Sequence, residues 1–304
     1  MTFEIDRSSI DAGLVRRLVA GQFPQWAGLP VEPVSPGGWD NRTFRLGEHL
    51  SVRLPSAERY VAQVEKEQRW LPVLARELPR PIPEPVALGR PGEGYPWPWS
   101  VYGWIEGTPA DKGHIGDMAG FASDLGAFLV ALRRVGTANG PLAGDHNFFR
   151  GSDLAVYAHE TEAALKLLGE TADQAVCRAI WDTALASRWE HAPVWVHGDV
   201  SSGNVLVREG RLAAVIDFGS SAIGDPACDL YIAWTFLDAV SRAAFRGAIG
   251  LDRACWARGR GWTLWKALIV MAGRSDGADD KWARRVISEI IADHARPWRG
   301  LSKI

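Results

Sequence analysis

Three short runs of apolar, largely β-branched residues lie close together in the second half of the chain, and they constrain the fold more than any other feature. The runs are Val194–Val196, Val205–Val207 and Ala213–Ile216. Each is too short for a stable helix, so the group indicates short strands joined by tight loops. Because polar residues stand at the ends of the runs, these loops should present a set of side chains on a rigid frame.

Three of those polar residues have the chemistry of a phosphoryl-transfer site. Asp199 follows the first run, Asn204 comes five residues later, and Asp217 ends the third run thirteen residues after that. Phosphoryl transfer requires an acidic side chain that accepts or orients the hydroxyl proton, and oxygen ligands that hold Mg²⁺ against the phosphates. The alternative is a hairpin whose polar residues only face solvent. The compound pattern of His-Gly-Asp, Asn and Ile-Asp-Phe-Gly, each after an apolar run, favours the catalytic interpretation.

The stretch HGDVSSGN followed by IDFG resembles the catalytic core of the aminoglycoside phosphotransferase family, which is related to the protein kinases. The order of elements is similar over roughly residues 30–295. The resemblance implies a bilobal, protein-kinase-like α+β fold with a small β-rich N-terminal lobe and a larger, mainly helical C-terminal lobe. It places the nucleotide between the lobes.

The resemblance also implies roles for individual residues. Asp199 matches the catalytic aspartate, Asn204 and Asp217 match the two magnesium ligands, and His197 matches the histidine that braces the loop. The implied cofactor is Mg²⁺, with ATP or GTP as co-substrate. The implied reaction transfers the terminal phosphoryl group to a hydroxyl of an antibiotic, first of all an aminoglycoside, which would confer antibiotic resistance.

The first hundred residues contain candidate parts of the nucleotide site. Gly37 and Gly38 lie where the family has a glycine-containing loop over the phosphates, although an ordinary hairpin turn explains them equally well. Arg53 takes the place of the usual strand lysine, and it can donate to phosphate or to a carboxylate as a bidentate fork. Its helix partner would be Glu67, with Glu65 as a close competitor.

The segment WSVYGWI, residues 99–105, reads as a buried strand that leads into the hinge. The resemblance predicts that backbone groups of Gly103 and Ile105 bind the base, and that Tyr102 flanks the back of the base pocket. A bulky residue at this position resembles members that use GTP, so both ATP and GTP stay open. We place the lobe boundary near Gly103, with residues 1–103 as the nucleotide-binding lobe and 104–304 as the catalytic and acceptor-binding lobe.

The other elements follow from periodicity and from proline content. A hairpin is expected over 43–54, and the proline-rich stretch 79–98 should form loops and edge strands. Apolar spacing predicts helices over 11–20, 61–77, 120–135, 153–168, 175–188, 229–238, 253–273 and 280–295.

The acceptor is the least constrained part of the prediction. Asp145, Asp153, Glu160 and Glu162 lie in an acidic middle segment and could bind a polycationic aminoglycoside. The last 80 residues carry more bases than acids and six tryptophans, which would suit a larger, more apolar acceptor such as a macrolide; the tryptophans could equally be core residues. They are Trp234, Trp256, Trp262, Trp265, Trp282 and Trp298. A small-metabolite kinase for choline, homoserine or a sugar and a non-catalytic pseudokinase are the remaining alternatives.

Asp225 and Asp229 could be further catalytic acids, but their places before a proline and at a helix start favour turn and capping roles. The net charge of -2 does not indicate a nucleic-acid surface. Three widely separated cysteines favour a reducing compartment, and neither a signal peptide nor a membrane-spanning run is recognisable. We therefore expect a cytoplasmic protein.

Overall fold

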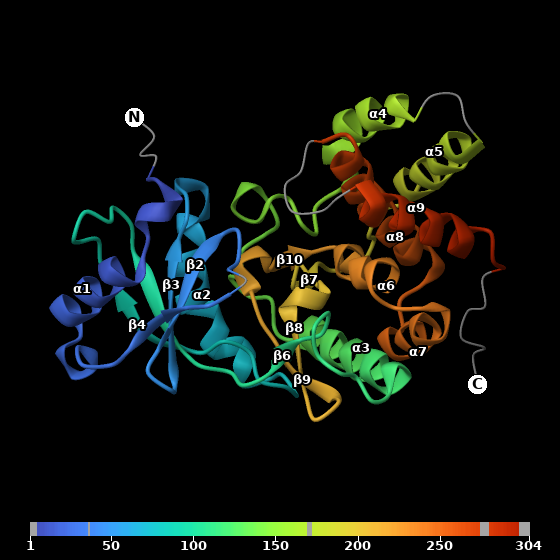
Figure 1. Cartoon of the computed structure of the whole chain (residues 1–304). Coiled ribbons are helices and arrows are strands. Elements are labelled where there is room, and N and C mark those ends of the chain that lie inside the picture. Colours follow the sequence, from blue (N-terminus) through green and yellow to red (C-terminus); the bar gives the residue numbers. More distant parts are fainter. Residues whose placement is uncertain (1–4, 36, 169–171, 274–279, 298–304) are drawn as a thin grey trace. The chain divides into compact units, whose positions relative to one another are not determined.

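The computed structural model describes residues 5–35, 37–168, 172–273 and 280–297 (Figure 1). Contacts divide the chain into two compact units. Unit 1 comprises the chain up to Gly107 together with Ala214–Ser220, and unit 2 comprises the remainder. The segment that carries Asp217 therefore packs with the N-terminal part of the chain, although it is distant in sequence.

Unit 1 is built on an antiparallel five-stranded sheet in the order β1-β2-β3-β5-β4. Its strands are β1 (Val31–Pro33), β2 (Asn41–Leu46), β3 (Leu50–Pro55), β4 (Pro85–Gly89) and β5 (Trp99–Gly103). The predicted hairpin over 43–54 is confirmed as the pair β2–β3, which closes where Leu46 faces Leu50. The proline-rich stretch supplies β4 at the sheet edge, where Pro85 interrupts no interior ladder.

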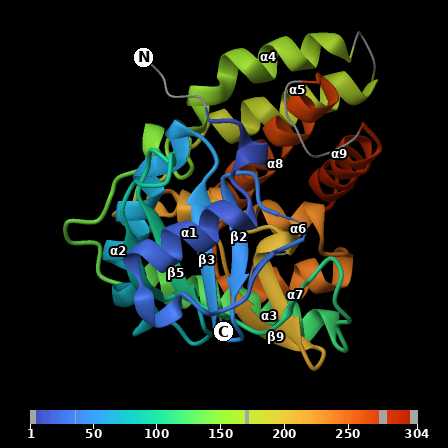
Figure 2. The ribbon, with the colours of Figure 1, turned by 60° about the vertical axis from the view of Figure 1, so that its left-hand side comes forward.

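Two helices complete unit 1, and the alternation of β3 determines what each one covers. Helix α1 (Ala12–Gln22) lies across the strands in Figure 2, and it buries its apolar side against a cluster that includes Val52 and Leu54 of β3. Arg53 points to the opposite face because successive strand residues alternate. That face carries α2 (Val61–Ala75), the helix that contains Glu67.

Unit 2 is mainly helical, as predicted, and its central helix is α8 (Arg253–Met271). Almost every residue of α8 is buried, because it packs against α4, α5 and α9. In both figures α4 and α5 lie alongside each other. The other helices of unit 2 are α3 (Met118–Arg134), α4 (Ala158–Leu167), α5 (Ala172–Leu185), α6 (Ile232–Thr235), α7 (Ala239–Ile249) and α9 (Asp280–His294).

The short apolar runs of the second half form strands, as predicted. Strand β7 (Val194–Val196) pairs with β10 (Ala222–Gly224), while β8 (Val205–Arg208) lies between β6 (Thr108–Pro109) and β9 (Arg211–Val215). No helix of the described residues is long and apolar enough to cross a membrane.

One predicted helix is wrong in its continuity. The helix expected over 229–238 is divided into a 3₁₀ segment, Pro226–Tyr231, and the single turn of α6. Asp238 then begins a new helix, because its carboxylate accepts hydrogen bonds from the amides of Val240 and Ser241 and so caps α7. Apolar periodicity alone did not reveal this capping signal.

A substitution of Gly89 tests how tightly unit 1 is packed. A Cβ atom at Gly89 would lie 2.0 Å from Cε2 of Trp99, a fully buried ring whose Nε1 donates to the carbonyl of Arg90. We therefore expect Gly89→Ala to lower the free energy of unfolding by about 1–3 kcal/mol, the usual scale of overpacking. Guanidinium denaturation measures this. Gly21→Ala, where nothing lies within 4 Å of the added atom, is the control and should be neutral or slightly stabilising. Equal stability of Gly89→Ala and wild type would contradict the packing.

Candidate active site

A buried carboxylate, that of Asp229, holds the loop that follows β7 in unit 2. Asp229 accepts hydrogen bonds from the backbone amides of His197 (3.0 Å) and Gly198 (2.8 Å). Gly198 has φ +82°, a conformation that favours glycine, so the chain turns sharply at this point. Burial raises the pKa of Asp229, while His197 and the two amides oppose that rise by favouring the carboxylate.

Asp199 and Asn204 lie together on this loop. The Asn204 Nδ2 donates to the Asp199 side chain at Oδ2 (2.9 Å) and to the Asp199 carbonyl (3.0 Å). The Asp199 amide donates to Nδ1 of the buried His197 at 3.2 Å. These contacts fix the Asp199 side chain and direct the nitrogen of Asn204 towards it. Among the described residues, the Asn204 oxygen has no hydrogen-bond donor, so it is available as a metal ligand.

Arg53 forms the centre of a second group of residues, which lies in unit 1. Its Nη1 is 3.3 Å from Glu67 Oε1, and its Nη2 is 2.7 Å from Asp217 Oδ1. Glu67 is therefore the helix partner, not Glu65. Although burial opposes its charge, Glu67 and Asp217 together raise the pKa of Arg53. The guanidinium thus joins β3, α2 and the segment that carries Asp217.

The Asp217 segment is fixed by further contacts within unit 1. Asp217 has φ +66°, a conformation that non-glycine residues adopt only when their surroundings hold them there. Two residues later, the Gly219 carbonyl accepts from Nζ of the buried Lys66 at 2.6 Å. Burial lowers the pKa of Lys66 to about 8, against the influence of Glu67 and Asp40. A Cβ at Gly219 would come within 2.6 Å of Gln63 Oε1, so α2 and this segment are closely packed.

Tyr102 belongs to the Arg53 group. It is buried in β5, and its hydroxyl donates a short hydrogen bond to Glu67 Oε2. The Arg53 guanidinium lies 5.5 Å from the Tyr102 ring centroid. Glu67 is therefore held by both Arg53 and Tyr102, which the sequence did not indicate. The predicted contact of Tyr102 with a base stays a prediction.

The structure shows which backbone amides of the predicted hinge are already bonded, while the predicted contact of Gly103 and Ile105 with a base stays a prediction. The amide of Gly103 donates to the Glu84 carbonyl at 3.1 Å, so this donor is already used within the sheet. Trp104 likewise donates to His49. The backbone of Ile105 has no hydrogen-bond partner among the described residues, and it is the hinge position with free groups. Sequence spacing could not show which hinge amide the edge of the sheet would occupy.

Gly37 and Gly38 lie between β1 and β2, and neither glycine has a positive φ. Arg7 donates to the carbonyls of Gly38 and Trp39, and Ser56 Oγ donates to the Trp39 carbonyl at 2.6 Å. Trp39 itself is 59% exposed. Pro36, which precedes this loop, lies outside the described residues. The loop is therefore anchored at its carbonyls, and its role over phosphates stays a prediction.

Three of the four acidic residues suggested for the acceptor already have partners, and Asp145 is the exception among the described residues. Asp153 pairs with Arg188 at 3.1 Å, Glu162 pairs with Arg178 at 3.0 Å, and Glu160 accepts from Trp265 Nε1 at 3.1 Å. The suggestion that these acids form an unpaired anionic acceptor surface is weakened by these contacts, since two of them have a cationic partner within the chain.

The C-terminal tryptophans are largely core residues. Trp234, Trp256, Trp262 and Trp265 are each at most 4% exposed, so they cannot line an open pocket for a large apolar acceptor. Trp298 lies outside the described residues. Tyr157 stacks on Trp265 with ring centroids 3.8 Å apart, which shows the same close packing around α8.

Asp225 and Asp229 differ in their roles, although the sequence suggested structural roles for both. Asp225 caps the 3₁₀ segment and pairs with the buried Arg258, with a distance of 2.6 Å from Arg258 Nε to Asp225 Oδ2. Asp229 instead holds the loop that carries Asp199. This role was not recognisable from the sequence, because the two amides lie 32 and 31 residues before Asp229 and only the tertiary fold brings them to its carboxylate.

The sequence profile of the phosphotransferase enzyme family matches residues 31–262. The chain belongs to this family. The predicted family and the predicted enzyme class, a phosphotransferase, are thereby confirmed. No curated protein sequence matches the chain.

Solved structures support the predicted kinase-like fold. The chain is similar to the GDP and kanamycin complex of APH(2")-IIia, with a TM-score of 0.73, 18% identity and coverage of 93% of this chain and 99% of that one. It is also similar to apo macrolide 2'-phosphotransferase MphH from Brachybacterium faecium, with a TM-score of 0.59, 21% identity and coverage of 90% and 97%. The ADP-bound aminoglycoside phosphotransferase APH(2'')-Ib gives a TM-score of 0.58 at 17% identity, with coverage of 93% and 97%. The fold prediction is confirmed.

Removing the Asp229 carboxylate should loosen the catalytic loop. In Asp229→Ala the buried amides of His197 and Gly198 lose their acceptor, at a cost of about 1–3 kcal/mol for each unsatisfied group. We expect a lower melting temperature and faster hydrogen exchange at these two amides. Asp229→Asn keeps one acceptor oxygen and should fall between the alanine variant and wild type. Unchanged protection of both amides in Asp229→Ala would show that the carboxylate does not hold the loop.

Proposed function

We propose that this phosphotransferase transfers the terminal phosphoryl group of ATP or GTP to a hydroxyl group of an antibiotic, with Asp199 as the catalytic base. The observation that carries the proposal is the Asp199–Asn204 pair, on a loop held by Asp229. Membership of the phosphotransferase enzyme family supports the reaction type. Among similar structures, those with GDP, with ADP and with ATP and streptomycin support a nucleotide co-substrate.

Asp199 would act on the acceptor hydroxyl. In phosphoryl transfer the protein contributes mainly positioning and electrostatic stabilisation. The hydrogen bond from Asn204 restrains the Asp199 Oδ2, which leaves Oδ1 to accept the hydroxyl proton. His197 would brace the loop through its contact with the Asp199 amide.

Asn204 and Asp217 would hold Mg²⁺. Both provide hard oxygen donors, the type that this ion prefers, and the Asn204 oxygen is directed away from its own internal contact. Bound there, Mg²⁺ would neutralise charge on the nucleotide phosphates. Asp217 is already held in position by Arg53 and by its backbone conformation, so its carboxylate requires little reorganisation.

Arg53 would bind the phosphates in place of the usual lysine, while Glu67 keeps its guanidinium in position. Ile105 would offer free backbone groups to the base, with Tyr102 behind it and Gly37 and Gly38 over the phosphates. The raised pKa keeps Arg53 protonated, so its guanidinium can donate charge-assisted hydrogen bonds to a phosphate.

For the acceptor we propose an aminoglycoside first, on the family resemblance. A macrolide is the second candidate, because the pairing of Asp153 and Glu162 with arginines removes two of the carboxylates that a polycation would need. A turnover screen over aminoglycosides, macrolides and small hydroxylated metabolites distinguishes these acceptors.

Two substitutions should distinguish the role of the catalytic base from that of the metal ligand. Asp199→Asn should bind nucleotide and magnesium nearly normally, while kcat falls by at least on the order of 10²-fold, the scale of general-base contributions. Asp217→Asn should also impair magnesium-dependent nucleotide binding. Calorimetric titration with and without Mg²⁺, together with turnover on the best acceptor, measures both effects.

Asp111→Asn, at an exposed position of unit 2, is the control and should leave both quantities unchanged. Full turnover in Asp199→Asn would refute the catalytic assignment. Tight nucleotide binding by wild type with no turnover of any acceptor would favour a pseudokinase.

Arg53 offers a second test. Arg53→Ala should weaken nucleotide binding at least about tenfold, since a charge-assisted phosphate contact is lost and Glu67 and Asp217 are left without their shared cation. Arg53→Lys restores the charge but not the fork, so it should recover part of the affinity. Calorimetry gives the dissociation constants, and a thermal melt shows whether the alanine variant is folded. Wild-type affinity in a folded Arg53→Ala variant would exclude the phosphate role.

A further inference from the structure

Helices α5, α7, α8 and α9 of unit 2 surround a cavity of about 390 Å³ that belongs to none of the elements discussed as the active site. Most of the ionisable side chains that line it are basic. Four arginines and a histidine contribute to it, against a single carboxylate. These residues are Arg246, Arg253, Arg260, His294, Arg296 and Asp293.

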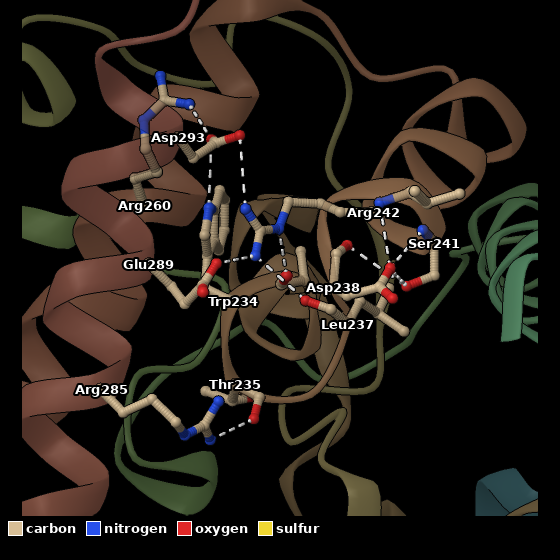
Figure 3. Close-up of polar contacts among 12 residues, drawn as sticks. Trp234, Thr235, Leu237, Asp238, Ser241, Arg242, Arg260, Arg285, Glu289 and Asp293 are labelled. Atoms are coloured by element: carbon tan, nitrogen blue, oxygen red, sulfur yellow. Dashed lines mark hydrogen bonds and ion pairs between the residues drawn. The ribbon is translucent and has the colours of Figure 1, made fainter.

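The one carboxylate is already shared. Asp293 accepts from Arg246 at 3.1 Å, from Arg260 at 3.0 Å and from Trp234 Nε1 at 3.2 Å. Figure 3 shows Arg260 and Trp234 converging on it, with Arg242 alongside. Arg242 has its own partner in Glu289 at 2.7 Å and is only 3.8 Å from Asp293. Asp293 can therefore balance no more than one of the cavity arginines.

Two of the cavity arginines have no ion-pair partner among the described residues. Arg253 and Arg296 are exposed, and neither forms an ion pair with another described residue. Among the residues that line the cavity, four arginines thus accompany one aspartate. This agrees with the excess of bases over acids in the last 80 residues of the sequence.

The buried arginine is affected by this excess. Burial lowers the pKa of Arg260, and the positive charges of Arg246 and Arg253 add to that effect against Asp293. Burial also lowers the pKa of His294, with Arg260 and Arg253 acting in the same direction. A bound anion would relieve the repulsion between these guanidinium groups.

From this geometry we propose that the cavity is a binding site for a small anion of the phosphate class that carries two or more negative charges. Guanidinium forks match phosphate oxygens in pairs, and several arginines can share one phosphate. The volume lies within the usual range of small-molecule pockets. The side-chain hydroxyls of Thr183 and Ser187 border the same space and add neutral polar groups. The site shares no residue with the catalytic loop.

Calorimetry with inorganic phosphate as the probe tests the site. A saturating non-hydrolysable nucleotide analogue with Mg²⁺ keeps the nucleotide site filled, including its terminal phosphate position, and ionic strength is held constant with chloride. We expect saturable binding that weakens at least about tenfold in the double variant Arg253→Gln and Arg296→Gln, because two charge-assisted contacts are lost. Both positions are exposed, so the fold should tolerate the changes.

Arg211→Gln, an exposed arginine of β9, is the matched control and should bind phosphate as wild type does. Acetate should bind at least about tenfold more weakly than phosphate, since it carries one charge. Glycerol phosphate tests whether an ester is accepted in place of the free ion, and binding of either supports the site.

Three results would overturn the proposal: no saturable phosphate binding, equal binding by the double variant and by wild type with a normal melting temperature, or equal affinity for acetate and phosphate. Asp199→Asn should keep wild-type phosphate affinity. Loss of turnover in that variant therefore tests the proposed function alone, while the cavity variants test this site.

Discussion

The ion pairs of the partly buried Arg53 guanidinium are the interaction on which the organisation of unit 1 most depends. The guanidinium contacts Glu67 of α2 and Asp217 of a segment 164 residues away along the chain. A buried cation needs compensating carboxylates, so the presence of Arg53 requires both partners to stay in place. This requirement brings a late segment of the chain into the N-terminal unit and positions a candidate metal ligand at the same time.

Unit 2 uses the same physical principle with the opposite charge. Asp229 is a buried carboxylate whose compensation comes largely from two loop amides, and those amides belong to the residues directly before Asp199. In α8, Arg258 is compensated by Asp225 and Arg260 by Asp293. Each acid that holds structure is thereby withdrawn from ligand binding. At the cavity between α5, α7, α8 and α9, Arg253 and Arg296 have no such carboxylate partner among the described residues.

Much of the fold was predictable because the relevant signals are local. The β2–β3 hairpin follows from two alternating segments around Gly47, and the helical character of unit 2 follows from apolar spacing. The division of the helix expected over 229–238 was missed because apolar periodicity does not show where a new helix begins. Asp238 caps the next helix, and such a capping signal involves only a few residues. The bond from the Gly103 amide to Glu84 was not predictable, because it depends on the path of the proline-rich segment.

The sequence by itself determined the type of chemistry: the order of His197, Asp199, Asn204 and Asp217 after β-branched runs indicated a phosphotransferase, and the family match confirms that class. This motif can be recognised in a sequence because its polar residues follow the ends of strands at short, fixed spacings. Only the tertiary structure decided that Glu67 pairs with Arg53, that Asp229 holds the loop, that four of the C-terminal tryptophans are core, and that four arginines meet around one cavity. Their partners lie many residues apart, and burial and charge compensation act through space, which spacing along a chain does not encode.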